Sequence, residues 1–376
     1  MDFSLSEEQQ ILKDSVDRFV REEYSLDQRR TLVATDEGFS RENWSKMAEL
    51  GWLGVAVPEA YGGIGGGAVE IMVMMESFGE GLVVEPYMSS IVLGGGLIAE
   101  GGDEAQKQAI LPSLAEGKIM LAFGYAERQS RYDLFDVETK AEKNGAGYVL
   151  NGHKGVVFHA AVADKIIVSA RTAGGSRDTN GITLFILDNN CAGLSRRDYP
   201  TVDGLRASEL TLENVKVGSD AVLGDVDGGF ALLDTISQQG IAALAAESVG
   251  CMSVLLNTTN EYVKTRKQFG QPIGKFQVIQ HRMADMFIAC EEARSMSYLA
   301  TLRLEDPDAG ERARASAAAK VQIGKSLVYV SQQAVQLHGG MGMTDELNVG
   351  HYFKRLTMID TMLGDQDYHL KRYAEM

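Results

Sequence analysis

The spacing of apolar residues changes twice along the chain, and these two changes restrict the folds that the chain can adopt. Up to about residue 118, apolar residues recur at helical spacing. From about 119, short β-rich runs such as GITLFIL and LTLENVKV are separated by NG and GG turn signals. After about 225 the pattern is helical again, with long helices expected at 229–268, 275–304, 311–338 and 346–374. This order predicts a mainly α protein of three domains: a helical domain at 1–118, a β domain at 119–225 and a four-helix bundle at 226–376.

Charge and cysteine content exclude several classes of function. The 376 residues include 36 Lys plus Arg against 52 Asp plus Glu, a formal charge of −16, which argues against non-specific binding to nucleic acid or anionic lipid. The three cysteines have no CxxC spacing and the six histidines lack the spacing of a zinc enzyme, so neither disulfides nor a metal are expected. With no basic signal segment and no apolar run approaching ~20 residues, we expect a cytoplasmic protein that does not enter the membrane.

A single glutamate interrupts the most apolar stretch, IAALAAESVGCMSVLL at 241–256. An ionised carboxylate in apolar surroundings is costly unless it is paired, reaches solvent or takes up a proton. Glu247 therefore lies on a half-exposed helix, pairs with an arginine in the core, or stands in an apolar groove as a base. Burial of a carboxyl raises its pKa and makes it a usable general base. From this stretch alone a structural role is the commoner outcome.

Three glycine-rich or basic motifs are candidates for ligand contact. The run GGIGGG at 62–67 follows no buried strand and ends in no GKS or GKT, so it predicts a turn. The segment TRKQFG at 265–270 suits a dinucleotide pyrophosphate and its adenine, but also an ordinary cationic helix end. The segment QLHGGMGM at 336–343 ends a helix with glycines that either cap it or let a cofactor approach the backbone.

Taken together, LGVAVPEAYGG, YVLNGHK, TRKQFGQPIGKFQ and QLHGGMGM, in this order, resemble the acyl-CoA dehydrogenase family over essentially the whole chain. The C-terminal stretch GHYFKRLTMIDTMLGDQDYHL is most similar to the pimeloyl-CoA dehydrogenase small-subunit type. The resemblance implies a helical N-terminal domain, a β-barrel-like middle domain and a C-terminal four-helix bundle, assembled as a tetramer with FAD. It implies an enzyme that converts an acyl-CoA thioester to a trans-2-enoyl-CoA and passes electrons to an electron-transferring flavoprotein.

The resemblance also implies roles for individual residues. It assigns the ADP half of FAD, held from a neighbouring subunit, to Arg266, Gln268, Phe269, Gln277, Gln336, Gly339 and Gly340. In many members the base that takes the α-proton is a glutamate before a glycine in the last helical segment, but that position is Leu363 here. Other members supply the carboxylate from the first long helix of the bundle, two turns from Glu247. Glu247 is therefore the predicted base, with Asp365 as its rival.

Two departures from the family pattern leave alternatives open. The flavin-facing segment reads AERQSRYD at 126–133, with Ala126, Arg131 and Tyr132 where small hydrogen-bonding residues are expected. A strand that usually reads Trp-Ile followed by Thr or Ser is VVF at 156–158. The chain could therefore be a subunit that completes the flavin site of a paralogous chain, in an α2β2 heterotetramer instead of a homotetramer. A flavin-dependent monooxygenase on the same fold is a further alternative, against which Glu247 argues.

Overall fold

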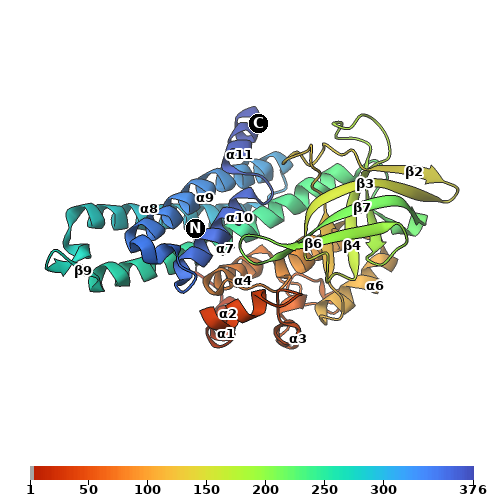
Figure 1. The fold of residues 1–376 in the computed structure, drawn as a ribbon. Helices are drawn as coiled ribbons and strands as arrows, with labels where there is room; N and C mark the ends of the chain where they lie inside the picture. The colour runs from red at the N-terminus through yellow and green to blue at the C-terminus, as the bar shows by residue number, and fades with distance from the viewer. Residues whose placement is uncertain (1–3) are drawn as a thin grey trace. The chain divides into compact units, whose positions relative to one another are not determined.

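The computed structural model describes residues 4–376 and divides the chain into two compact units. The first unit contains the residues up to Thr31 together with 68–83 and 241–376, and the second contains 32–67 and 84–240. Each unit therefore combines segments that are far apart in the sequence (Figure 1). The domain boundaries expected at 118 and 225 stay predictions.

The first unit is helical. Its longest helices are α7 (Gly229–Thr265, of which residues from 241 belong here), α8 (Gln277–Arg303) and α9 (Ala309–His338), and α9 packs against α8, α10 (Asn348–Thr361) and α11 (Gln366–Glu375). The N-terminal helix α1 (Glu7–Glu23) packs against α4 (Ala68–Gly81). A hairpin of β9 (Lys267–Gln268) and β10 (Gln271–Pro272) joins α7 to α8 and lies at the far left of Figure 1.

Glycine lets α4 and α7 approach closely inside this unit. A Cβ atom on Gly79 would lie 2.1 Å from the carbonyl oxygen of Glu247, and one on Gly250 would lie 1.9 Å from that of Glu76. No larger residue fits either position without moving a backbone. The backbone around Glu247 is therefore held in a fixed place.

Two features of the helices correct the expectations from sequence. The helix expected at 346–374 is two helices, because Leu363 (φ 55°) and Gly364 (φ 104°) adopt left-handed conformations between α10 and α11. The bundle segment after 226 therefore contains five α-helices within the described part of the chain. In addition, α7 is long and apolar enough to cross a membrane, although no run of that length was expected. Because 78% of its most apolar window is buried, as in the core helix of many soluble proteins, this is weak evidence for a membrane span.

An eight-stranded sheet forms the centre of the second unit. Its strands are β1 (Leu121–Gly124), β2 (Lys140–Asn144), β3 (Gly147–Phe158), β4 (Lys165–Arg171), β5 (Ile182–Asp188), β6 (Leu194–Pro200), β7 (Arg206–Val217) and β8 (Val222–Leu223). They lie in the order β6-β7-β3-β2-β4-β5-β8, and β1 pairs in parallel with β4. Buried side chains such as Leu150, Ile166, Phe185 and Leu210 make its core. The β-rich runs of the sequence thus form one sheet.

Short helices complete the second unit. They are α2 (Leu26–Val33), which crosses the boundary of the first unit, α3 (Arg41–Glu49), α5 (Gly96–Gly101) and α6 (Glu104–Ala115), with a π-helix, η3 (Met88–Gly95), that lies against β1. The run GGIGGG at 62–67 belongs to no helix or strand, as the turn prediction requires. The predicted fold, with helical segments on either side of a middle β region, is confirmed.

Candidate functional site

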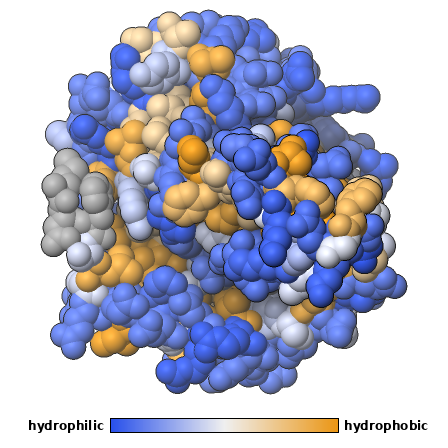
Figure 2. Space-filling view, turned by 90° about the vertical axis from the view of Figure 1, so that its left-hand side faces the viewer, coloured by the Kyte–Doolittle hydropathy of each residue, from blue (hydrophilic) through white to orange (hydrophobic). Residues whose placement is uncertain are grey.

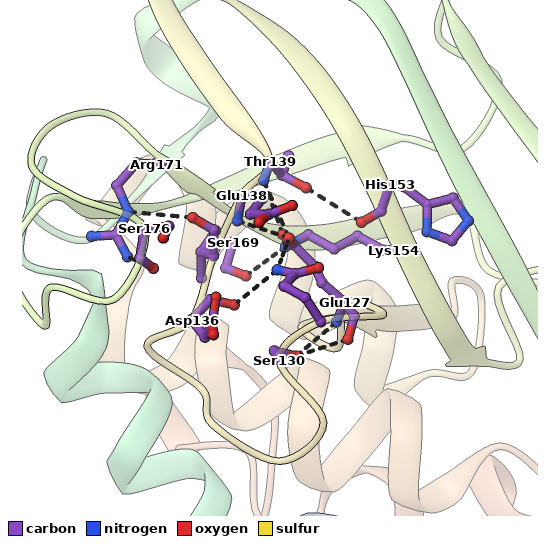
Figure 3. Close-up of polar contacts among 12 residues, drawn as sticks. Glu127, Ser130, Asp136, Glu138, Thr139, His153, Lys154, Ser169, Arg171 and Ser176 are labelled. Atoms are coloured by element: carbon purple, nitrogen blue, oxygen red, sulfur yellow. Dashed lines mark hydrogen bonds and ion pairs between the residues drawn. The ribbon is translucent and has the colours of Figure 1, made fainter.

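The segment that the resemblance assigns to the flavin, AERQSRYD, lies in the loop between β1 and β2. Glu127 closes this loop on itself, because its buried carboxylate accepts the backbone N–H groups of Glu138 (2.8 Å) and Thr139 (3.1 Å) (Figure 3). The side-chain amide of Gln129 donates to the same carboxylate at 2.8 Å. The loop therefore has a defined course without regular secondary structure.

Lys154 on β3 neutralises the Glu127 carboxylate. Its Nζ lies 2.6 Å from Glu127 Oε1 and 3.0 Å from Ser169 Oγ on β4, and its side chain is fully buried. Burial opposes ionisation of Glu127, but the charge and hydrogen bonds of Lys154, with those of its other donors, outweigh burial and lower its pKa to about 2. Burial also lowers the pKa of Lys154 against the opposing effect of Glu127. The pair fastens the loop to two strands of the sheet.

Arg171, the last residue of β4, ties this loop to the loop at 172–181. Its guanidinium donates to five backbone carbonyl oxygens at 2.7–3.5 Å, those of Phe135, Val137, Ser176, Asp178 and Asn180. The N–H of Val137 also donates to the carbonyl oxygen of Ser176 at 2.8 Å. The loops at 125–139 and 172–181 are therefore one hydrogen-bonded body.

β3 carries a bulge immediately after Lys154, within the VVF strand. Its register with β7 shifts between Lys154 and Val157, and Val156 has a left-handed φ of 52°. The N–H of Gly155 donates to the carbonyl oxygen of Ala126 at 2.9 Å. The strand thus contacts the loop at 125–139 through its backbone, and neither Val156 nor Phe158 offers a hydroxyl where the resemblance implies Thr or Ser.

Glu247 is bound by an arginine that the sequence analysis did not identify. Arg355 on α10 donates from Nε to Oε1 at 2.5 Å and from Nη2 to Oε2 at 2.7 Å, and the two residues are 5% and 4% exposed. The prediction that Glu247 stands in an apolar groove is wrong, because both oxygens of its carboxylate face the guanidinium of Arg355. The geometry is that of the alternative in which Glu247 pairs with an arginine in the core. Its assignment as the α-proton base stays a prediction.

Helical spacing is the signal that could have identified Arg355. Tyr352, Leu356 and Ile359 are the buried residues of α10 around it, so Arg355 stands on the apolar face of the helix. A buried arginine needs hydrogen-bond acceptors, and a carboxylate is the acceptor that also neutralises its charge. The lone glutamate of the most apolar stretch is the matching carboxylate.

The rival base, Asp365, belongs to the turn between α10 and α11. Its carboxylate caps α11 by accepting a backbone N–H of the first turn at 2.8 Å. The same turn is held by His369, whose Nε2 lies 2.8 Å from the carbonyl oxygen of Leu363, and by buried Lys320, whose Nζ donates to that of Ile359 at 2.6 Å. Leu363 is thus in a fixed position, but it has no group that accepts a proton.

The residues assigned to the ADP half of FAD lie in two groups of the first unit. One group is on the hairpin after α7 and at the start of α8: Arg266, Gln268, Phe269 and Gln277. Phe269 is 91% exposed and has a left-handed φ of 53°. The other group is at the end of α9: Gln336, Gly339 and Gly340.

Tyr262 and His338, to which the sequence analysis gave no role, link the two groups. Their ring centroids are 4.3 Å apart, and Tyr262 Oη donates to the carbonyl oxygen of His338 at 3.4 Å. His338 Nδ1 lies 2.8 Å from the carbonyl oxygen of Ala334, which assigns the proton to Nδ1, while buried Nε2 has no hydrogen-bond partner within residues 4–376. A Cβ on Gly339 or Gly340 would meet no atom within 4 Å. A free acceptor beside open backbone fits a bound cofactor.

Comparison with known protein families agrees with this arrangement. The N-terminal, middle and C-terminal domains of acyl-CoA dehydrogenase match residues 6–118, 122–215 and 227–376. A "Probable acyl-CoA dehydrogenase YngJ" of Bacillus subtilis is 34% identical over 98% of this chain and 97% of its own length. The "Caffeyl-CoA reductase-Etf complex subunit CarC" of Acetobacterium woodii is 31% identical over 84% of each chain.

Solved structures are similar over the full length of the chain. Butyryl-CoA dehydrogenase from Megasphaera elsdenii has a TM-score of 0.90 at 28% identity and covers 100% of this chain and 99% of that one. A chain of the ChsE4-ChsE5 complex from Mycobacterium tuberculosis has the same TM-score and identity, with 100% and 98% covered.

Proposed function

Because the chain belongs to the acyl-CoA dehydrogenase family, whose members depend on FAD, we propose that it acts in the α,β-dehydrogenation of an acyl-CoA thioester to a trans-2-enoyl-CoA. The observation that carries the proposal is the family match across all three domains. When bound, FAD supplies the hydride acceptor for the hydrogen that leaves the β-carbon.

Residues of the first unit are suited to hold the ADP half of this cofactor. Arg266 and Gln268 present a guanidinium and an amide from an exposed hairpin, which suits a pyrophosphate. Gly339 and Gly340 leave the backbone open to close approach, and His338 Nε2 is an acceptor ready for a donor of the cofactor. Their task is to bind and orient the cofactor.

An electron-transferring flavoprotein is the proposed acceptor of the electrons. The support is the relative named as a subunit of a caffeyl-CoA reductase-Etf complex. The three cysteines are free thiols, which suits work in a reducing cytoplasm.

Assembly into a tetramer is supported by the exposed surface of α8. Five large apolar side chains of this helix are 37–58% exposed: Val278, Phe287, Ile288, Leu299 and Leu302. Tyr298, Leu299 and Leu302 line a groove of about 680 Å³ on the same helix. Figure 2 shows separate apolar patches on an otherwise hydrophilic face. Apolar surface of this kind is typical of subunit contacts, in a homotetramer or an α2β2 heterotetramer.

The source of the α-proton base separates two candidate functions. In the first, Glu247 leaves Arg355 and takes the proton. In the second, the chain completes the flavin site of a paralogous large subunit that supplies the base, in keeping with the pimeloyl-CoA dehydrogenase small-subunit resemblance. Three observations favour the second: Arg355 binds both oxygens of Glu247, Asp365 caps α11, and Leu363 stands at the family's usual base position.

The absorbance spectrum of the purified chain, before and after addition of candidate acyl-CoAs, tests both candidates. If the chain completes a partner's site, it will bind FAD substoichiometrically alone and gain flavin and acyl-CoA-driven bleaching on mixing with the large subunit. A homotetramer with one FAD per chain and full turnover would eliminate the second candidate. Absence of bleaching with every acyl-CoA, alone and with the partner, would overturn the dehydrogenase proposal itself.

A further inference from the structure

Two arginines of the flavin-facing loop have no partner, although the acids around them do. Asp133 and Asp136 both pair with Arg177, at 2.8 and 2.9 Å, and Glu127 is paired as described above. Arg128 and Arg131 are exposed and make no hydrogen bond or ion pair with any residue from 4 to 376. In a chain with a formal charge of −16, two unpaired cations in one loop form a local basic site.

Arg131 stands at a position that disfavours it. The N–H of Asp133 donates to the carbonyl oxygen of Ser130 at 2.9 Å and closes a four-residue turn in which Arg131 is second, with a left-handed φ of 49°. Turns with positive φ at this position prefer Gly, Asn or Asp, and a long side chain there costs free energy. An arginine that is strained and also unpaired contributes nothing visible to the fold, so its guanidinium is available for a ligand.

The loop presents this guanidinium from a rigid base. Glu127 closes the loop and is fastened to Lys154 (Figure 3), and Arg171 donates to the carbonyl oxygen of Phe135 in its second half. A side chain on such a support loses less conformational entropy on binding than one on a mobile loop.

We infer that Arg131, with Arg128 in the same loop, binds an oxyanion of the acyl-CoA substrate. The inference rests on the proposed function. A guanidinium binds phosphate and carboxylate through paired N–H donors. The substrate can supply the oxyanion from the phosphates of CoA or from a terminal carboxylate on a dicarboxylic acyl group.

Dissociation constants of the holoprotein, with its partner if one is needed for flavin, distinguish the two sources. The probes are free CoA, a monocarboxylic acyl-CoA and a dicarboxylic acyl-CoA of equal length, measured by calorimetry for wild type, Arg131→Gly, Arg131→Lys and the control Lys143→Gln. If Arg131 binds phosphate, Arg131→Gly weakens all three probes about tenfold or more. If it binds the acyl carboxylate, only the dicarboxylic probe is weakened to that extent.

The variants also separate a binding role from a structural one. Glycine fits the left-handed turn, so Arg131→Gly should keep or raise Tm while it loses affinity, and Arg131→Lys should retain part of the affinity through its charge. Lys143, exposed on β2, should show no effect. Affinities of Arg131→Gly within twofold of wild type for all three probes would overturn the inference. Bleaching of the wild-type flavin by acyl-CoA is measured separately, so that result would leave the dehydrogenase proposal standing.

Discussion

Glu247→Gln should destabilise the protein strongly, because it removes the charge that neutralises a buried guanidinium. Arg355 is 5% exposed and donates two short hydrogen bonds to the carboxylate, and an amide can accept from only one of the two donors. Removing one partner of a buried ion pair costs about 3–5 kcal/mol. In a cooperative unit of roughly 150–250 residues each kcal/mol lowers Tm by about 2–4 °C, so the expected decrease is about 6–20 °C.

Thermal unfolding followed by far-UV circular dichroism checks this decrease. A cycle of Glu247→Gln, Arg355→Met and the double variant should give a coupling energy of roughly 1–3 kcal/mol, because each single change leaves the other group unpaired. A free catalytic base behaves differently: its loss would leave Tm unchanged and reduce acyl-CoA-driven bleaching by about 10²–10⁴ fold. That combination would refute the structural role of the ion pair and support Glu247 as the base.

Three further outcomes are expected. Glu127→Gln should make the free energy of unfolding depend less on pH in the acid range. The pKa of Glu127 is about 2 in the folded protein against an ordinary 4.5, so its ionised carboxylate contributes about 3 kcal/mol above pH 4.5, and this contribution is lost as the pH falls toward 2. Urea unfolding of wild type and variant from pH 2 to 7 measures the difference. Gly340→Ala should leave the Tm of the apoprotein unchanged, because the added Cβ meets no atom within 4 Å, but it should lower the flavin-to-protein absorbance ratio. Gly63→Ala is the destabilising control, because its Cβ would lie 1.9 Å from the Val57 carbonyl oxygen. Arg266→Ala should reduce FAD content but not bleaching per bound flavin, and full occupancy would contradict its role.

The fold could be predicted from the sequence because it depends on the spacing of apolar residues along the chain. Apolar residues at helical spacing on either side of alternating β-rich runs determine which segments form helices and which enter the sheet, whatever their distant partners are. The break between α10 and α11 was harder to predict from the sequence. Gly364 is a residue at which a helix commonly ends, but only the left-handed φ of 55° at Leu363 shows that the helix ends one residue before the position that Gly364 alone would indicate.

The candidate site was predictable only in part because its central contacts join distant residues. Glu247 was identified as unusual, but its partner lies 108 residues further along the chain, and sequence alone left the ion pair and the apolar groove as alternatives. His338 was quoted within its motif, yet its role depends on an acceptor without a partner, which is a property of packing. Lys154 was likewise quoted in YVLNGHK, and only its contact with Glu127 shows why the position needs a cation.

The segment TAGGSRDTNG at 172–181 looks like a surface turn that could be shortened or exchanged freely. Three of its backbone carbonyls accept from Arg171, and Arg177 within it pairs with two acids of the loop at 125–139. A graft that shortens the turn would release those two acids and could remove up to three of the five carbonyl oxygens that Arg171 contacts. The two segments must therefore be transplanted between homologues as a single unit, although residues 140–171 separate them in the sequence.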